Sequence, residues 1–307
     1  MHIGILGTGF GAYHGQIYKK LDPSIQLTFW GRNAEKLKEI QNSIQCEYTT
    51  DLEQFLSTKS FDFVDICLPS QLHTTYALKT LSHHHSIFLE TPAVLSIEEG
   101  LEIANYAKNL GKKVLVNMFL QYDPYYQLIK TCLENKNYGD LKHLSIFRKT
   151  PPLWGPLGTD KIGTSLMIHD LDFAMWIEKN LSLSKATLIS NTENTGAVVD
   201  CLLSNDTLNV HVHGNSMLPE TAPFSVGYEA IFEKASISYF EESASDLLNS
   251  KCCIYTNNTK ENLTFELLPH CEALLDAVIK DMRNEKPSNL SLENALNALN
   301  IAFKLKI

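Results

Sequence analysis

The sequence predicts an α/β chain in which an N-terminal doubly wound parallel sheet precedes an α+β domain with a large, mostly antiparallel sheet. Strand and helix patterns alternate over the first 120 residues, which favours parallel strands joined by right-handed crossovers, with helices on both faces. After Tyr122-Asp123-Pro124 the helices become few and strands follow one another. We therefore divide the chain into a domain of residues 1–121 and a domain of residues 122–307.

The first domain shows five apolar segments separated by segments of helical periodicity. We expect strands at 2–7, 25–30, 62–68, 86–89 and 113–118 and helices at 11–21, 33–42, 51–57, 72–82 and 96–110. Residues 63–68 are nearly all apolar, as expected for a central parallel strand. That strand ends at Pro69-Ser70, at the sheet edge where such sheets bind ligands.

The second domain begins with a helix and continues mainly as strands. We expect helices at 124–135, 164–178, 270–283 and 291–304, and strands at 141–149, 185–190, 197–203, 207–216, 225–232, 235–240, 252–256 and 262–267. Several strands, such as Asn209–His213, alternate apolar and polar residues. That pattern is typical of a sheet with one buried face and one exposed face.

Composition and charge limit the kinds of binding partner and the cellular compartment that we expect. The net charge of −9 disfavours nucleic acid, because phosphate neutralisation needs clustered Lys and Arg. No apolar run is long enough for a membrane span, and the chain begins as a strand rather than a signal peptide. Seven cysteines without a Cys-x-x-Cys pair fit a reducing compartment, so we expect a cytoplasmic protein. We interpret the run His83-His84-His85 as a solvated turn and predict no metal site.

Residues 1–21 carry the strongest functional signal: a strand, then Gly-x-Gly-x-x-Ala, then a helix. Gly7 suits the tight turn, Gly9 lets the backbone approach a pyrophosphate, and Ala12 allows close packing of helix on strand. The helix N-terminus offers free N–H groups to the phosphates. This is the dinucleotide-binding (Rossmann) fingerprint, and the residues expected to bind the cofactor there are Gly7, Thr8, Gly9, Phe10, Gly11 and Ala12.

The second expected strand ends in Gly31-Arg32-Asn33, where an NAD-binding site normally has an acidic residue for the ribose 2′-hydroxyl. Arg32 can instead accept a 2′-phosphate, so we predict NADP(H) as the preferred cofactor, with NAD(H) possible; Arg32 could also stack on adenine without discriminating. His73 could contact the cofactor directly or have a structural role. Further cofactor contacts are expected at strand ends, namely Leu68, Pro69, Ser70, His73, Glu90, Pro92 and Asn117.

The expected helix at 164–178 is apolar on most sides, so its polar groups should be paired. Ser165, His169 and Asp172 lie at i, i+4 and i+7 and would share one face of a continuous helix. We expect that face to border a cleft, with His169 as the proton-transfer group, although a structural His–Asp pair explains the pattern equally well.

Four segments, GILGTGFGAYH, LPSQLHTTYALKTL, LETP and SLMIHDLDFAMW, occur in the order found in the glucose-fructose oxidoreductase/inositol dehydrogenase (Gfo/Idh/MocA) family, which this chain resembles over nearly its whole length. The resemblance implies a nicotinamide-dependent oxidoreductase with a Lys in Glu-Lys-Pro and an Asp-x-x-x-His motif. It implies that the His takes the hydroxyl proton and the Lys holds the substrate.

The sequence departs from that pattern at several catalytic positions. Thr91 stands at the Lys position and Ser165 at the Asp position, whereas His169 is retained. Gln121 stands where an Arg commonly precedes the turn. General acid–base help is worth roughly 10²–10⁴ in rate, so these departures should change the chemistry or abolish it.

Three interpretations follow. The first is an active reductase of a sugar-like or small carbonyl, hydroxyl or imine substrate, with His169 assisted by Tyr122, Tyr125, Lys149 or Lys161. The second is a catalytically inactive NAD(P)-binding sensor or scaffold. The third, a sugar-like ligand site without dinucleotide, is disfavoured by the intact Gly loop. The catalytic candidates are His169, Thr91, Ser165, Asp172, Tyr122 and Lys161.

The second domain's sheet needs cover on both faces or a polar outer face, and the final helices can cover only part of it. The resemblance implies that the exposed sheet face pairs between subunits. We therefore expect a homodimer or homotetramer whose other partner is a small-molecule substrate.

Overall fold

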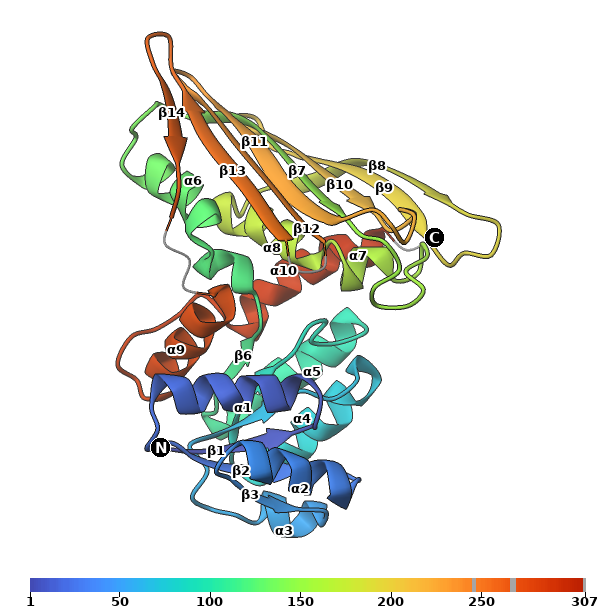
Figure 1. Ribbon diagram of the computed structural model, residues 1–307, viewed down its shortest axis with the longest axis vertical. Helices are drawn as coiled ribbons and strands as arrows, with labels where there is room; N and C mark the ends of the chain where they lie inside the picture. The colour runs from blue at the N-terminus through green and yellow to red at the C-terminus, as the bar shows by residue number, and fades with distance from the viewer. Residues whose placement is uncertain (245–246, 266–268, 306–307) are drawn as a thin grey trace. The chain divides into compact units, whose positions relative to one another are not determined.

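The computed structural model describes residues 1–244, 247–265 and 269–305, and the chain forms two compact units (Figure 1). The first unit is Met1–Phe119 with Leu268–Leu296, and the second is Leu120–Leu267 with Asn297–Ile307. The main break lies close to the boundary expected at 121/122, but the late segment around helix α9 (His270–Met282) joins the first unit. Helix α9 packs on helix α1 (Phe10–Leu21), and Asp281 at its end pairs with Lys113.

The first unit contains a six-stranded parallel sheet in the order β3-β2-β1-β4-β5-β6. Its strands are β1 (His2–Leu6), β2 (Gln26–Trp30), β3 (Glu47–Thr49), β4 (Phe63–Ile66), β5 (Ser86–Leu89) and β6 (Val114–Val116). The helices between them are α1, α2 (Ala34–Ser43), α3 (Leu52–Leu56), η1 (Ser70–Leu72), α4 (His73–Ser82) and α5 (Ile97–Leu110). Because the strand order reverses after β1, right-handed crossovers place helices on both faces, as expected.

Two local expectations for the first unit were wrong. Strand β3 was not foreseen, because Glu-Tyr-Thr is short, polar and paired only with β2 at the sheet edge. The His83–His85 turn is not solvated throughout, since His85 is buried and its Nε2 lies 2.9 Å from the Leu56 carbonyl oxygen. Packing against the Phe61 ring explains this burial.

The second unit contains an eight-stranded sheet in the order β14-β13-β12-β11-β7-β10-β9-β8. Among the described strands of this sheet, only β7 and β10 pair in parallel, so the α/β class with a mostly antiparallel second sheet is confirmed. The strands are β7 (Leu141–Lys149), β8 (Ser182–Ser190), β9 (Ala197–Ser204), β10 (Asn209–Asn215), β11 (Phe224–Phe232), β12 (Ser236–Ala244), β13 (Leu247–Tyr255) and β14 (Lys260–Leu263).

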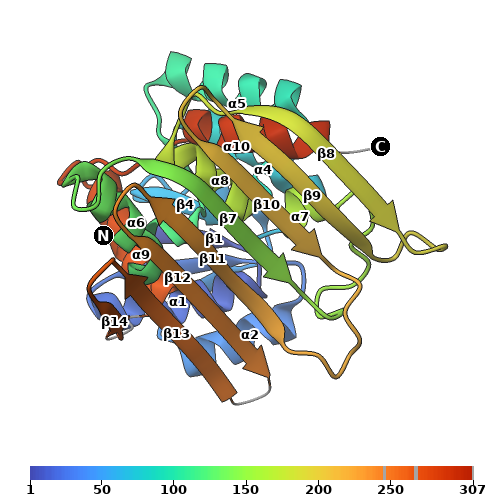
Figure 2. The ribbon, with the colours of Figure 1, turned by 90° about the horizontal axis from the view of Figure 1, so that it is seen from above.

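Helices cover one face of this second sheet, and the other face is open in the view of Figure 2. The remaining elements are η2 (Phe119–Tyr122), α6 (Pro124–Glu134), α7 (Ile162–Ser165), α8 (Ile168–Ile177) and α10 (Leu292–Lys304). The single helix expected at 164–178 is therefore two helices with a turn at Leu166-Met167. Met167 N donates to Ile162 O five residues back, so the α-helical hydrogen-bond pattern is interrupted there.

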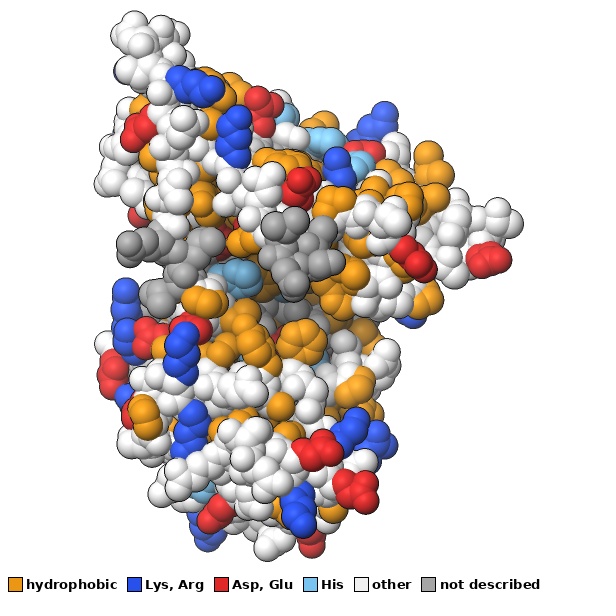
Figure 3. Space-filling model, in the orientation of Figure 1, with side chains coloured by type: hydrophobic (Ala, Val, Ile, Leu, Met, Phe, Trp, Pro, Cys, Tyr) orange, Lys and Arg blue, Asp and Glu red, His pale blue; other side chains and the backbone are white. Residues whose placement is uncertain are grey.

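The open face of the second sheet carries both apolar and ionic groups. Ile189, Leu202 and Phe240 are exposed on it. One carboxylate oxygen of Asp200 lies 2.9 Å from His211 Nε2 and 2.8 Å from His213 Nδ1. On the drawn face of each unit, both signs of charge are interspersed with apolar side chains (Figure 3). Every helix of the described chain is too short or too polar to cross a bilayer.

Candidate active site

The Gly loop between β1 and α1 has the backbone that a dinucleotide site requires. Gly7 has φ +121°, and a Cβ there would collide with the Cys67 carbonyl oxygen, so only glycine fits. A Cβ on Gly9 would meet no atom within 4 Å, which leaves this position open to a pyrophosphate. No side chain caps α1 and its first turn has no acidic residue, so N–H groups of this turn can donate hydrogen bonds to an anion.

The close contact between helix α1 and the sheet is made by glycines rather than by Ala12. A Cβ on Gly11 would lie 2.7 Å from Ile5 Cγ2, and one on Gly15 would lie 2.7 Å from the Phe29 ring. The packing role expected of Ala12 therefore belongs to Gly11, one residue earlier, with Gly15 as a second contact. Ala12 is partly exposed, and its N–H donates to Gly9 O.

The end of β2 lies against the Gly loop. Gly7 N donates to Trp30 O, and a Cβ on Gly31 would lie 2.8 Å from Thr8 Cγ2. Arg32 is exposed. Asn33 is the cap of α2, because its Oδ1 accepts from the N–H groups of Glu35 and Lys36. Of the three residues, Arg32 is thus the one whose side chain is available to a ribose or phosphate.

His73 joins the two loops that follow β4 and β5. Its ring is fully buried, with Nε2 2.7 Å from Leu68 O and Nδ1 3.0 Å from Pro92 O. These contacts hold the turn at Leu68–Ser70 beside the cis Thr91-Pro92 bond. Of the two roles considered for His73, a cofactor contact or a structural role, the structural role accounts for both of its ring nitrogens.

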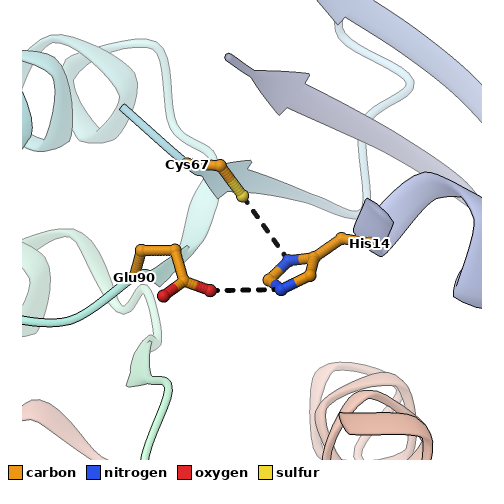
Figure 4. A group of neighbouring side chains, drawn as sticks. All are labelled: His14, Cys67 and Glu90. Carbon is orange, nitrogen blue, oxygen red and sulfur yellow. Dashed lines mark hydrogen bonds and ion pairs between the residues drawn. The ribbon is translucent and has the colours of Figure 1, made fainter. Parts of the chain in front are cut away.

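Glu90, at the end of β5, belongs to a buried polar cluster that also contains His14, Asp65 and Cys67. Figure 4 draws three of these side chains, those of His14, Cys67 and Glu90. His14 Nδ1 lies 2.9 Å from Asp65 Oδ2, and His14 Nε2 lies 3.1 Å from Glu90 Oε1. Asn117 Nδ2 donates to Glu90 over 2.6 Å, so the two expected cofactor residues Glu90 and Asn117 are brought together.

The cluster fixes the charge of its members. Burial disfavours the charged imidazole, but the Asp65 carboxylate outweighs it and raises the pKa of His14 far above its usual value. Burial likewise opposes ionisation of Glu90, yet the His14 and Asn117 hydrogen bonds hold the pKa of Glu90 below its usual value. Burial raises the pKa of the Cys67 thiol, so it stays protonated and donates to Asp65.

In the second unit, helix α8 carries His169, Asp170 and Asp172. Asp170 is buried and receives two hydrogen bonds from Arg148 of β7, of 2.7 Å from Nε and 3.0 Å from Nη2. This bidentate pair fixes α8 on the sheet. His169, next to Asp170, is partly exposed.

Asp172 is buried and has an amide as its hydrogen-bond partner. Gln121 Nε2 donates to Asp172 Oδ2 over 2.9 Å. Burial raises the pKa of Asp172 to about 7, and the Gln121 hydrogen bond offsets only part of that rise. Asp172 therefore changes charge near neutral pH, one helical turn from His169.

The structure does not gather all the other candidates around His169. Ser165 lies on α7, beyond the turn at Leu166-Met167. The prediction that it shares one helix face with His169 and Asp172 is therefore wrong. Lys149 lies over the Phe147 ring on the open face of the sheet, and Tyr125 is buried in an aromatic core with Tyr239. Lys161 is exposed and Tyr122 partly exposed in the second unit.

Sequence reasoning missed His14, Asp65 and Arg148. Two of them had a signal: Asp65 interrupts an apolar strand, and Arg148 continues the buried alternation of Leu144 and Ile146 in β7. A charge at a buried position implies a buried partner. The partners were not predictable, because they come from distant parts of the chain.

Comparisons with known proteins agree with this geometry. Residues 1–118 match the family model described as "Oxidoreductase family, NAD-binding Rossmann fold". The chain is 28% identical over 182 residues to the uncharacterized oxidoreductase YrbE of Bacillus subtilis, a match that covers 57% of this chain and 52% of that one. The chain thus spans about half the length of this relative, and less of some others.

Two solved structures share the fold over the whole chain. One is described as a candidate NADPH-dependent oxidoreductase from Desulfitobacterium hafniense, with TM-score 0.87, 17% identity, and coverage of 100% of this chain and 94% of that one. The other is the UDP-N-acetylglucosamine 3-dehydrogenase GnnA from Acidithiobacillus ferrooxidans, with TM-score 0.82, 18% identity, and coverage of 100% and 96%.

Proposed function

We propose that this chain, whose first 118 residues belong to the Gfo/Idh/MocA oxidoreductase family, is an NAD(P)-dependent oxidoreductase that acts on a sugar-like or small carbonyl, hydroxyl or imine substrate in the reductive direction. The observation that carries the proposal is the Gly loop. Gly7 can only be glycine, Gly9 is open, and the α1 N-terminus is uncapped. These are the features that a bound pyrophosphate needs.

The residues that would hold the cofactor are Gly7 to Ala12 at the pyrophosphate, Arg32 at the adenosine ribose, and Glu90 with Asn117 on the nicotinamide side. Arg32 favours NADP(H), because a guanidinium binds a phosphate by two hydrogen bonds. Residues Gly31–Asn33 include no carboxylate that would repel the 2′-phosphate. When bound, the nicotinamide supplies the hydride.

His169 is the proposed proton donor to the substrate oxygen or nitrogen. Its helix is fixed by the Arg148–Asp170 pair, and Asp172 offers a second titrating group one turn away. Thr91 and Ser165 stand where the family has charged side chains, so neither residue would bring a charge to the substrate. Tyr122 and Lys161 are the further candidates for assisting His169.

A second candidate function is a catalytically inactive NAD(P)-binding sensor or scaffold. Thr91 and Ser165 favour it, because they remove the cation and the acid that the family uses in proton transfer. Both functions require dinucleotide binding, and only the first predicts oxidation of NADPH in the presence of a carbonyl substrate.

The proposed assembly is a homodimer or homotetramer through the open face of the second sheet. The exposed apolar side chains of Ile189, Leu202 and Phe240 support it. Sedimentation analysis tests it: the expected result is an oligomer, and Leu202→Glu should shift it toward the monomer. A monomeric wild-type protein would contradict the proposal.

The experiment that tests the cofactor proposal is a fluorescence titration with NADPH and, separately, NADH. Saturable binding that is tighter for NADPH is expected. Arg32→Asp should weaken NADPH binding by about tenfold or more, because a phosphate-binding cation becomes a repelling carboxylate. Unchanged NADPH affinity in this variant would remove Arg32 from the site. A screen of carbonyl substrates with NADPH then separates the two functions.

A further inference from the structure

We propose that the His14–Asp65–Glu90 cluster gives the first unit one net negative charge on its nicotinamide side, and that this charge makes the site favour the oxidised dinucleotide over the reduced one. The inference rests on the proposed function, which places Glu90 beside the nicotinamide. All three residues lie within the first unit, and Figure 4 shows the contact of His14 with Glu90.

The contacts are those expected of two carboxylates. Asp65 accepts three hydrogen bonds, from His14 Nδ1, Tyr18 Oη and Cys67 Sγ. Glu90 accepts two, from Asn117 Nδ2 and the Thr91 N–H, and its Oε1 forms an ion pair with His14 Nε2 over 3.1 Å. Neither carboxyl group has a contact in which it must donate, so neither needs a proton.

The imidazole between them supplies one positive charge. Both nitrogens of His14 face carboxylate oxygens, so the ring carries two protons. Two carboxylates and one imidazolium leave one negative charge. If the Nε2 proton moves across the 3.1 Å contact to Glu90, the sum is the same.

Nothing in the described chain cancels this charge at close range. No Lys or Arg of the described residues forms an ion pair with Asp65 or Glu90, and the neighbouring Thr91 is neutral. Cys67 and Tyr18 stay protonated, because burial raises the pKa of each. The cluster therefore keeps its charge over the ordinary pH range.

A charge of this sign distinguishes the two forms of the cofactor. The oxidised nicotinamide ring is positive and the reduced ring is neutral, so a nearby buried carboxylate stabilises the oxidised form selectively. At the effective dielectric of a protein site and a separation of several ångströms, the preference is on the order of tenfold. Product NADP⁺ would then leave slowly, as in enzymes limited by cofactor release.

The test is the ratio of NADP⁺ to NADPH affinity, measured by calorimetric titration of wild type, Glu90→Gln and Thr91→Lys. Each variant removes the net negative charge, the first by neutralising a carboxylate and the second by adding a cation at a partly exposed position. Each should reduce the NADP⁺ preference about tenfold, mainly by weakening NADP⁺ binding. Thr91→Lys does not disturb the buried hydrogen bonds, so the test survives if Glu90→Gln fails to fold.

Glu102→Gln is the matched control, because it removes the same charge at an exposed position of α5 and should leave the ratio unchanged. An unchanged ratio in both test variants overturns this inference alone, whereas failure of wild type to bind either form overturns the proposed function.

A bound metal ion would be a different use of the same side chains. The atoms of His14, Cys67 and Glu90 that could coordinate a metal lie within 4.8 Å of one another. A stoichiometric divalent metal in the purified protein would displace the protons that the account assigns to His14 and Cys67, and would overturn the inference.

Discussion

Glu90 in the first unit and Asp172 in the second are both largely buried carboxyl groups, but they differ in the partner that faces them. Glu90 meets the His14 imidazolium, and its pKa is held below the usual value. Asp172 meets the Gln121 amide, and burial raises its pKa to about 7. The charge of the partner, more than the degree of burial, therefore decides whether a buried carboxyl group is ionised.

The difference divides the chemistry of the chain between its units. The first unit keeps the same ionisation state over the ordinary pH range, so the charge that faces the proposed cofactor does not change with pH. The second unit carries a group that titrates near neutral pH, beside the proposed proton donor His169. Each variant below changes one side of this comparison.

Removing the cation from the first cluster should have the largest effect. His14→Gln leaves Asp65 and Glu90 facing a neutral side chain, and an uncompensated buried charge costs about 3–5 kcal/mol of stability. Chemical denaturation of wild type and variant measures this. His83→Gln is the control, because His83 is partly exposed and 3.8 Å from Glu53, so its loss should cost less than about 1 kcal/mol. Equal effects of the two variants would show that His14 carries no essential charge.

Neutralising Asp172 should change the pH dependence of stability. The folded pKa rises from 3.8 to about 7, so between these values the folded chain holds a proton that the unfolded chain has released. The free energy of unfolding should therefore fall as pH rises from about 4 to 7 and stay low above it. Asp172→Asn lacks this loss. As pH rises from 4.5 to 8, the unfolding free energy of the variant should therefore increase relative to that of wild type by about 3–4 kcal/mol.

Denaturation curves of both proteins at several pH values test this prediction. The difference between them isolates Asp172, because the titration of His14 is common to both. A wild-type-minus-variant difference that is flat between pH 4.5 and pH 8 would mean that Asp172 is already ionised at low pH.

Giving Asp172 a cation should make it resemble Glu90. Gln121→Arg places a guanidinium at the position of the present amide, which favours the carboxylate and lowers the pKa of Asp172. We expect a gain of about 2 kcal/mol at pH 8 and little change at pH 4.5, in the same denaturation experiment. Gln121→Leu, which removes the hydrogen bond without adding charge, should raise the pKa of Asp172 further and extend the fall in stability to higher pH. A slope unchanged by Gln121→Arg would contradict the comparison.

The sequence predicted most of the architecture because its periodicities are strong. Alternating strands and helices before residue 120 and serial strands after residue 180 match the two sheets. Strand β3 was missed because its three residues carry no apolar pattern. The turn at Leu166-Met167 was missed because an apolar run looks alike in one helix or two.

The candidate site was less predictable, because its pairings are made by the fold. The roles of Gly7 and Gly9 could be predicted, because they depend on the local backbone and the Gly-x-Gly spacing is visible in the sequence. The contacts of His14 with Asp65 and of Arg148 with Asp170 join residues that are 51 and 22 positions apart. The sequence shows that Asp65 and Arg148 need partners, and only the structure shows which residues those are.

The most direct test of the account is a fluorescence titration of NADPH against wild type and Gly9→Ala. A methyl group on Gly9 meets no atom of the chain within 4 Å but occupies the space proposed for the pyrophosphate. Wild type should bind saturably, and the variant should bind at least about tenfold more weakly with its circular dichroism spectrum unchanged. Equal binding by both proteins, or no binding by wild type, would contradict the claim that this loop holds a dinucleotide.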